Sequence, residues 1–154
     1  MATGYPALLG ARWCRATVPG TRRGYAGAMT DSHTVWRRTI ERFEAGEYWD
    51  AHEELEPLWL EAEGLERELA AGVILLAAAL HKARAMDNPR GGRRNYAKAL
   101  RHLALVPDTF QGVDVRTLEA SVHRALIDAS TRPRWPGGVP TRPAGDPAGR
   151  GAGA

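Results

Sequence analysis

Three residues of this sequence have types and a spacing that could do chemistry: His52, Glu53 and Glu56. On a helix, His52 and Glu56 are one turn apart, so an imidazole and a carboxylate can meet, and Glu53 stands at the edge of the same face. A nitrogen and an oxygen ligand at positions i and i+4 resemble the layout of zinc proteases, although the second histidine of that motif is absent. The His-Glu-x-x-Glu pattern therefore indicates a metal site or an acid–base site as one hypothesis.

Apolar neighbours surround this cluster. A helical wheel drawn at about 100° per residue places His52 and Glu56 between two apolar flanks, one containing Trp59 and the other Trp49. Burying a carboxylate without a partner costs several kcal/mol, so Glu56 should meet a cation, accept hydrogen bonds or be held neutral. The candidate partners for Glu56 are His81, Arg84 and an arginine of residues 90–94. Two tryptophans that border a histidine and two carboxylates would also suit a small polar ligand.

Three interpretations of the cluster remain open. In the first it is a pocket for a small ligand, and in the second it is a structural network of buried polar groups. In the third, His52 and Glu56 bind a metal ion, with His81 as a further ligand. Glu53 would then act as the general base of a hydrolase-like enzyme. The catalytic residues, the cofactor and the substrate stay unassigned at this stage.

Helical periodicity predicts the elements that position the cluster. Apolar residues recur at spacings of three and four, and no segment shows sustained alternation of period two, so we expect no sheet. The helix predicted over about 66–86 is apolar on nearly all sides and should lie in the middle. The sequence therefore predicts an all-α fold, a compact bundle of about five helices, over roughly residues 32–45, 48–63, 66–86, 96–105 and 114–126.

Charge divides the chain into a folded part and two tails. Residues 29–130 hold 13 Lys and Arg against 17 Asp and Glu, a net charge of −4, whereas the remainder holds eight Arg against the single Asp146, a net charge of +7. The tails, residues 1–28 and residues 131–154, are rich in Gly and Pro and are expected to be disordered around a helical domain over 29–130. The basic isoelectric point thus belongs to the tails, which argues against a specific nucleic-acid site.

Within the predicted domain the charge is uneven. Residues 44–68 carry ten acids and only Arg67 as a base, whereas residues 82–101 carry seven bases and only Asp87 as an acid. If these two segments touch, their opposite charges should attract. The basic stretch 90–94 could hold an anion as a turn that opens a helix, although a plain interhelical turn is the simpler interpretation.

The single cysteine, Cys14, excludes an intrachain disulfide and fits a reducing cytoplasm, where we expect the protein to be. The longest apolar run, Leu69 to Leu80, is too short for a membrane span, so no membrane partner is expected. A small molecule or a protein partner stays open, and the oligomeric state is not predicted.

The run from Phe43 to Trp59, FEAGEYWDAHEELEPLW, resembles the hallmark of domain of unknown function family 309, roughly G-x-Y-x-x-A-H-E-x-L-E-x-x-W. The likeness continues through 72–81, 88–92 and 112–115, and covers essentially residues 35–120. The family consists of small bacterial helical proteins, so the resemblance implies a compact all-α fold and an important role for the cluster around His52. It implies no activity.

A second likeness concerns the predicted corner between the first two helices. Residues 46–51 are similar to the turn of a tetratricopeptide helical hairpin, and residues 95–100 repeat it about 48 residues later. Tetratricopeptide arrays have a period of about 34 residues, so an array is not indicated. A scaffold that binds a partner peptide in a groove is the remaining alternative.

Overall fold

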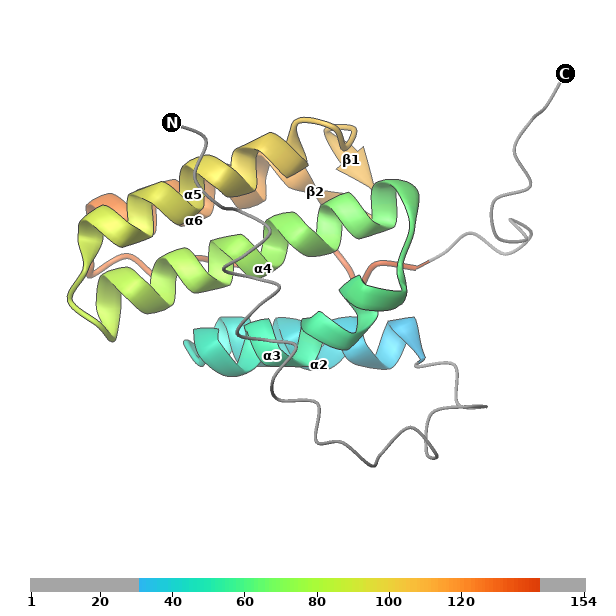
Figure 1. Ribbon diagram of the computed structural model, residues 1–154, viewed down its shortest axis with the longest axis horizontal. Coiled ribbons are helices and arrows are strands. Elements are labelled where there is room, and N and C mark those ends of the chain that lie inside the picture. Colours follow the sequence, from blue (N-terminus) through green and yellow to red (C-terminus); the bar gives the residue numbers. More distant parts are fainter. Residues whose placement is uncertain (1–30, 142–154) are drawn as a thin grey trace, which may run out of the picture.

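The computed structural model describes residues 31–141 of the 154-residue chain, and helices dominate this part (Figure 1). The described part contains five helices and one small sheet, which confirms the predicted bundle of about five helices. The extension expected over residues 1–28 lies outside the described residues. In chain order the elements are α2 (Ser32–Ala45), α3 (Tyr48–Glu61), α4 (Gly64–Arg84), α5 (Pro89–Leu103), β1 (Thr109–Phe110), β2 (Val113–Asp114) and α6 (Val115–Ile127).

Helix α4 is the central element, as predicted. It contacts α3 on one side and α5 and α6 on the other, while α2 packs on α3 (Figure 1). From Leu69 to Leu80, every residue except Ala78 is buried. Each large aliphatic side chain buried in this way contributes about 1.5–3 kcal/mol to folding. Among the helices between residues 31 and 141, none has the length and the apolar character needed to cross a bilayer.

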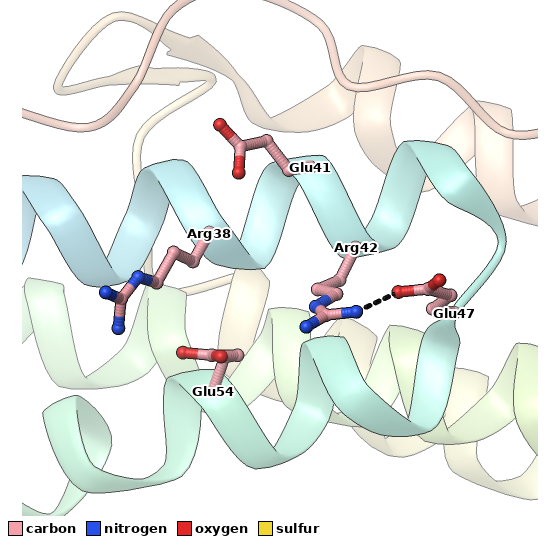
Figure 2. Close-up of a pocket in the computed structure, with 5 residues that line it drawn as sticks. All are labelled: Arg38, Glu41, Arg42, Glu47 and Glu54. Carbon is pink, nitrogen blue, oxygen red and sulfur yellow. Dashed lines mark hydrogen bonds and ion pairs between the residues drawn. The ribbon is translucent and has the colours of Figure 1, made fainter.

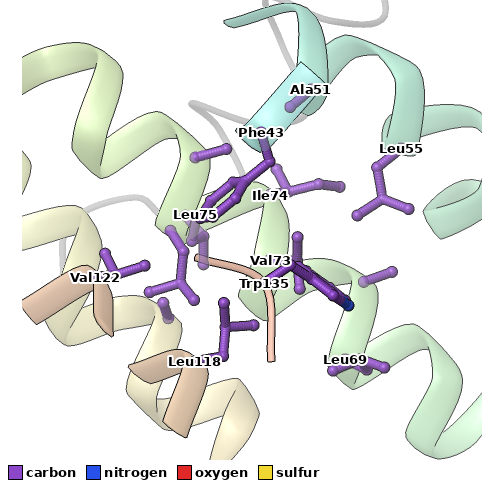
Figure 3. Close-up of a cluster of buried hydrophobic side chains, with 14 of the residues drawn as sticks. Phe43, Ala51, Leu55, Leu69, Val73, Ile74, Leu75, Leu118, Val122 and Trp135 are labelled. Atoms are coloured by element: carbon purple, nitrogen blue, oxygen red, sulfur yellow. The ribbon is translucent and has the colours of Figure 1, made fainter. Parts of the chain in front are cut away.

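The hydrophobic core joins all five described helices to a segment that follows α6. Figure 3 shows Phe43 of α2, Leu55 of α3, Val73 of α4 and Val122 of α6 in one cluster with the indole of Trp135. All five side chains are almost fully excluded from solvent. The core is therefore continuous from the first described helix to the end of the described chain.

Helices α4 and α5 approach each other closely because glycine stands at the contact. A Cβ atom on Gly72 would lie 2.4 Å from Cδ2 of Leu103. A Cβ atom on Gly92 would lie 2.8 Å from the carbonyl oxygen of Ala79. Real Cβ atoms do not come so near, so a side chain at position 92 would collide with backbone and one at position 72 would force Leu103 to shift.

The starts of two helices differ from the prediction. Gly64 is expected from the sequence to end a helix, but α3 already ends at Glu61 and Gly64 begins α4 with a φ of 57°. Helix α5 begins at Pro89, since the side chain of Asn88 accepts a hydrogen bond from Gly91 N at 2.8 Å and proline suits the first helical turn. Residues 90–94 are therefore helical, and the predicted basic turn is wrong.

The expectation that the chain contains no sheet is also wrong. Strands β1 and β2 pair in an antiparallel hairpin, with Phe110 opposite Val113. The two residues between them, Gln111 and Gly112, have φ values of 49° and 83°, as a type I′ hairpin turn requires. Strands of two residues are too short to produce a visible alternation, so the sequence pattern did not reveal them. Asp114, at which the last predicted helix begins, caps α6, because its side chain accepts a hydrogen bond from Thr117 N at 2.9 Å.

The predicted boundary of the C-terminal tail at residue 131 is wrong, because residues 131–141 pack on the helices. The ring of Trp135 lies 5.9 Å from that of Trp36 and 6.2 Å from that of Phe43, and its Nε1 donates to Gly138 O at 3.0 Å. The Gly and Pro content of this segment suggested disorder, but one buried indole anchors it. The rest of the predicted tail, residues 142–154, lies outside the described residues.

Replacing Gly92 by alanine should lower the free energy of unfolding by about 1–3 kcal/mol. The new Cβ would meet the backbone oxygen of Ala79, which cannot move aside alone. The better helix propensity of alanine, worth up to about 1 kcal/mol, offsets only part of this. Urea denaturation measures the change, with Gly138→Ala as the control because nothing lies within 4 Å of its added Cβ. Equal stability of the two variants would contradict the close α4–α5 contact.

Trp135→Ala should destabilise the protein by about 3–5 kcal/mol, because it removes an indole that is 7% exposed and empties a site in the core. Thermal and urea unfolding measure this loss. The control is Leu105→Ala, since that side chain is 63% exposed. A loss as small as that of the control would mean that residues 131–141 are not part of the folded unit.

Candidate functional site

The joint between α2 and α3 fixes the direction of α3. Gly46 has a left-handed φ of 83° and ends α2, and its N–H donates to Phe43 O at 3.1 Å. The rings of Phe43 and Tyr48 then meet edge to face, with their centroids 5.6 Å apart. This corner turns the chain back so that α3 packs on both α2 and α4.

Four of the predicted site residues form one stripe on α3. Trp49, His52, Glu53 and Glu56 stand at positions i, i+3, i+4 and i+7, which are neighbours on a helix surface. His52 is 2% exposed, whereas Trp49 is 38% exposed. Glu56 is half-buried and Glu53 is exposed. The stripe therefore runs from the core to the solvent.

Trp49 contacts two histidines from different helices. Its ring lies nearly parallel to that of His52, with the centroids 4.9 Å apart and an angle of 14° between the planes. Its ring centroid also lies 5.1 Å from that of His81 in α4, at an angle of 43°. The structure thus brings together three of the predicted residues, Trp49, His52 and His81, as one group of rings.

Burial controls the charge of His52. Desolvation, with a smaller contribution from the charge of His81, lowers the pKa of His52 from 6.5 to about 4. Removing an imidazolium from water is unfavourable, and a second imidazole nearby disfavours the charged form further. His52 is therefore neutral at pH 7.

Burial has the opposite effect on the pKa of a carboxylate on the stripe. Burial raises the pKa of Glu56, and the charge of Glu53 raises it further. Within residues 31–141, no ion pair or hydrogen bond joins Glu56 to any of its predicted partners. Arg84 in particular binds elsewhere, because its guanidinium donates to Tyr48 Oη at 3.3 Å and to Ala125 O at 3.1 Å. The predicted pairing of Glu56 with Arg84 is wrong.

Trp59 lies on the other flank of α3 and has a different role. The guanidinium of Arg67 stands 5.0 Å from the centre of its ring, and the indole packs partly against the core. Leu60, on the same flank as Trp49, is 60% exposed. The two apolar flanks are thus unequal, since only the one with Trp59 joins the core.

A metal site is not supported by the arrangement of the described side chains. Between residues 31 and 141, no three His, Cys, Asp or Glu side chains are grouped so that they could hold a metal ion. His52 and Glu56 would need at least one further ligand to form a three-ligand catalytic zinc site. The metal-dependent enzyme stays a prediction from the sequence alone.

A surface pocket that the sequence did not indicate lies between α2 and α3. Figure 2 shows the carboxylate of Glu54 between the side chains of Arg38 and Arg42, and Glu47 paired with Arg42 at 2.5 Å. Glu41 completes the lining. Because acids and bases alternate here, the pocket has little net charge of its own. Its members are common surface residues, so neither their types nor their spacing could have singled them out.

The condition for attraction between the acidic and basic segments, that the two touch, is largely not met. Helices α3 and α5 lie on opposite sides of α4, so most of these charges are separated (Figure 1). In the described part of the chain, the contact that comes nearest to the prediction joins His102 Nδ1 of α5 to Glu68 Oε2 of α4 at 2.7 Å. The fold therefore keeps an acidic side and a basic side apart.

The comparisons with known proteins agree with this fold. The family model described as a domain of unknown function (DUF309) matches residues 36–95. A crystal structure of a conserved hypothetical protein from Thermus thermophilus is 44% identical over 60% of this chain and 96% of that chain, with a TM-score of 0.55. The chain therefore belongs to the DUF309 family. No protein with curated annotation matches it. Since neither description names an activity, function has to be argued from the site.

The lowered pKa of His52 should make stability depend on pH. The unfolded chain regains a pKa near 6.5, so it binds more protons than the folded state between about pH 4 and pH 6.5. The free energy of unfolding is therefore not reduced by His52 above pH 6.5, and it falls by about 3 kcal/mol as the pH decreases towards 4. Urea unfolding at a series of pH values should show a shallower dependence in His52→Gln, with exposed His33→Gln as the control. Parallel pH curves for the wild type and His52→Gln would contradict this prediction.

Proposed function

We propose that this protein binds a small organic cation at the α3 stripe, between the indole of Trp49 and the carboxylates of Glu53 and Glu56. One observation carries the proposal: a partly exposed indole shares the stripe with Glu53 and Glu56, and burial together with the charge of Glu53 raises the pKa of Glu56. The face of an indole attracts cations, by about 0.5–2 kcal/mol according to exposure. A positive ligand would also remove the unfavourable interaction between Glu53 and Glu56.

The histidines suit the same ligand. A protonated His52 would repel a cation, but the lowered pKa of its ring keeps it neutral at pH 7. The charge of the stripe then comes from its carboxylates and not from His52. Trp49 contacts both His52 and His81, so two neighbouring rings hold its indole in position.

A purely structural polar core accounts less well for these residues. Structural networks are buried, and their members satisfy one another. Here Trp49 and Glu53 are open to solvent, and Glu56 has a raised pKa, so its charge lowers stability as it stands. Unfavourable local electrostatics of this kind are typical of binding sites, where function sets the residues.

We place this function in the cytoplasm. The support is the single cysteine of the sequence, which fits a reducing compartment. A ligand such as a polyamine or a quaternary ammonium compound has the chemistry that the site requires.

Glu56→Gln should raise the melting temperature slightly at pH 7, because the folded protein disfavours the charged form of Glu56 and the amide removes that charge. Differential scanning calorimetry measures the shift. The control is Glu61→Gln, an exposed acid at the end of the same helix. A marked fall in melting temperature for Glu56→Gln alone would instead favour the structural network.

Ligand binding should be tested with tetramethylammonium, agmatine and Zn²⁺, followed by calorimetry and by the NMR signals of His52 and His81. An organic cation present at 100 times its dissociation constant should stabilise the wild type by about 2.7 kcal/mol. Trp49→Ala and Glu56→Gln should abolish the effect, whereas Glu61→Gln should keep it. If neither organic cation shifts these signals, the proposal fails. Zn²⁺ binding that is lost in His52→Gln would favour the metal site instead.

A further inference from the structure

The solvent face of α5 carries only positive charge. Its inner face consists of small or apolar residues together with Asn95, all of which are buried. On a wheel at about 100° per residue, the basic residues of the helix fall within an arc of about 140° opposite that face. Helix α5 contains no Asp or Glu. The basic residues of this arc, which we call the α5 basic face, are Arg90, Arg93, Arg94, Lys98 and Arg101.

Within residues 31–141, no ion pair with an acid neutralises the arginines of this face. Partial burial lowers the pKa of Lys98, and the positive charges of Lys82, Arg101 and Arg94 lower it further. Within the described residues, Arg90, Arg94 and Arg101 form no ion pair. Some arginines elsewhere on the surface do pair, as Arg37 does with Glu41 at 2.7 Å. The unpaired arginines of the α5 basic face are therefore open to an anionic partner.

The geometry of the face is linear. At 1.5 Å per residue, the step from Arg90 to Arg101 covers about 17 Å along the axis of one helix. That length spans about five base pairs of a duplex, whose backbone presents a regular row of phosphates. Arginine provides four of the five charges, and its guanidinium binds phosphate in a bidentate manner.

The surroundings of the face favour a polyanion over a membrane or an acidic protein. Ala97 is the one uncharged residue in the middle of the arc, so the face offers no large apolar side chain to insert into a bilayer. The most acidic helix, α3, lies across α4 and does not oppose an approaching polyanion (Figure 1). The rest of the sequence, outside residues 29–130, adds a net charge of +7.

We propose that the α5 basic face binds the phosphate backbone of a nucleic acid, without reading its sequence. The contacts are ionic and go to phosphate, so they carry no base specificity. This proposal concerns a different helix from the proposed cation site and does not depend on it.

The test measures binding of the full chain to a fluorescently labelled 20-base-pair DNA duplex between 50 and 200 mM salt. Each phosphate contact contributes about −0.9 to the slope of log K against log salt, so four contacts contribute about −4. A quadruple variant should lose most of this slope and bind at least about tenfold more weakly at 50 mM salt. That variant is Arg90→Gln, Arg94→Gln, Lys98→Gln and Arg101→Gln.

A control with the same loss of charge separates the α5 basic face from the overall charge of the protein. It changes four exposed arginines elsewhere and should bind nearly as well as the wild type. Circular dichroism should show both variants folded, and the α5 variant should be at least as stable as the wild type because the repulsion around Lys98 is gone. The control variant is Arg37→Gln, Arg38→Gln, Arg124→Gln and Arg134→Gln.

Equal DNA binding by the two variants would overturn the proposal, as would a wild-type protein that does not bind the duplex at 50 mM salt. Binding to phosphatidylserine vesicles without binding to DNA would also overturn it and would identify the face as a membrane contact. Self-association that only the α5 variant loses, again without DNA binding, would identify a second copy as the partner.

Discussion

The burial of α4 is the constraint on which the rest of the structure depends. A helix that is apolar on nearly every side must be covered on every side, and no single neighbour can do this. Helix α3, with α2 packed behind it, covers one side, and α5 and α6 cover the other. The acidic helix α3 and the basic helix α5 are thereby held apart. The charge asymmetry of the surface is thus a consequence of how the core is closed.

Close packing of α5 also decides which of its residues meet the solvent. Gly92 and Ala99 face α4 because anything larger would push the helices apart, and Gly72 on α4 accommodates Leu103 in the same way. Small side chains of α5 lie on its inner face, and its long charged side chains lie on the outer face. The arginines of α5 therefore stand in one row because glycine and alanine occupy the positions that alternate with them.

The sequence predicted the helices well because helical periodicity is a property of many residues at once. It placed α4 in the centre and Asp114 at the start of α6, and both are found. The sequence-based prediction failed where one or two residues determine the local structure. Trp135 anchors a segment of disordered composition, and Asn88 with Pro89 turns an expected loop into the first turn of a helix. Neither event leaves a periodic signal.

For the candidate site, the sequence could predict which residues lie on one face but not what each one meets. The wheel correctly placed His52, Glu53 and Glu56 together, because spacing on a helix is fixed by its geometry. It could not show that Arg84 donates hydrogen bonds to Tyr48 and to Ala125 near the end of α6, because these partners lie 36 and 41 residues away in the chain. Nor could it distinguish the exposed flank of α3 from the buried one.

The presence of a histidine at position 52 is itself informative. A leucine there could fill a 2% exposed position without the desolvation that lowers the pKa of the imidazole to about 4. Packing alone therefore does not explain His52. An imidazole that is buried and neutral gives the exposed Trp49 a flat ring to stack on, without adding a positive charge beside Glu53 and Glu56. The same burial that reduces stability at low pH thus keeps the stripe negative at neutral pH, which is the property that a cation-binding surface needs.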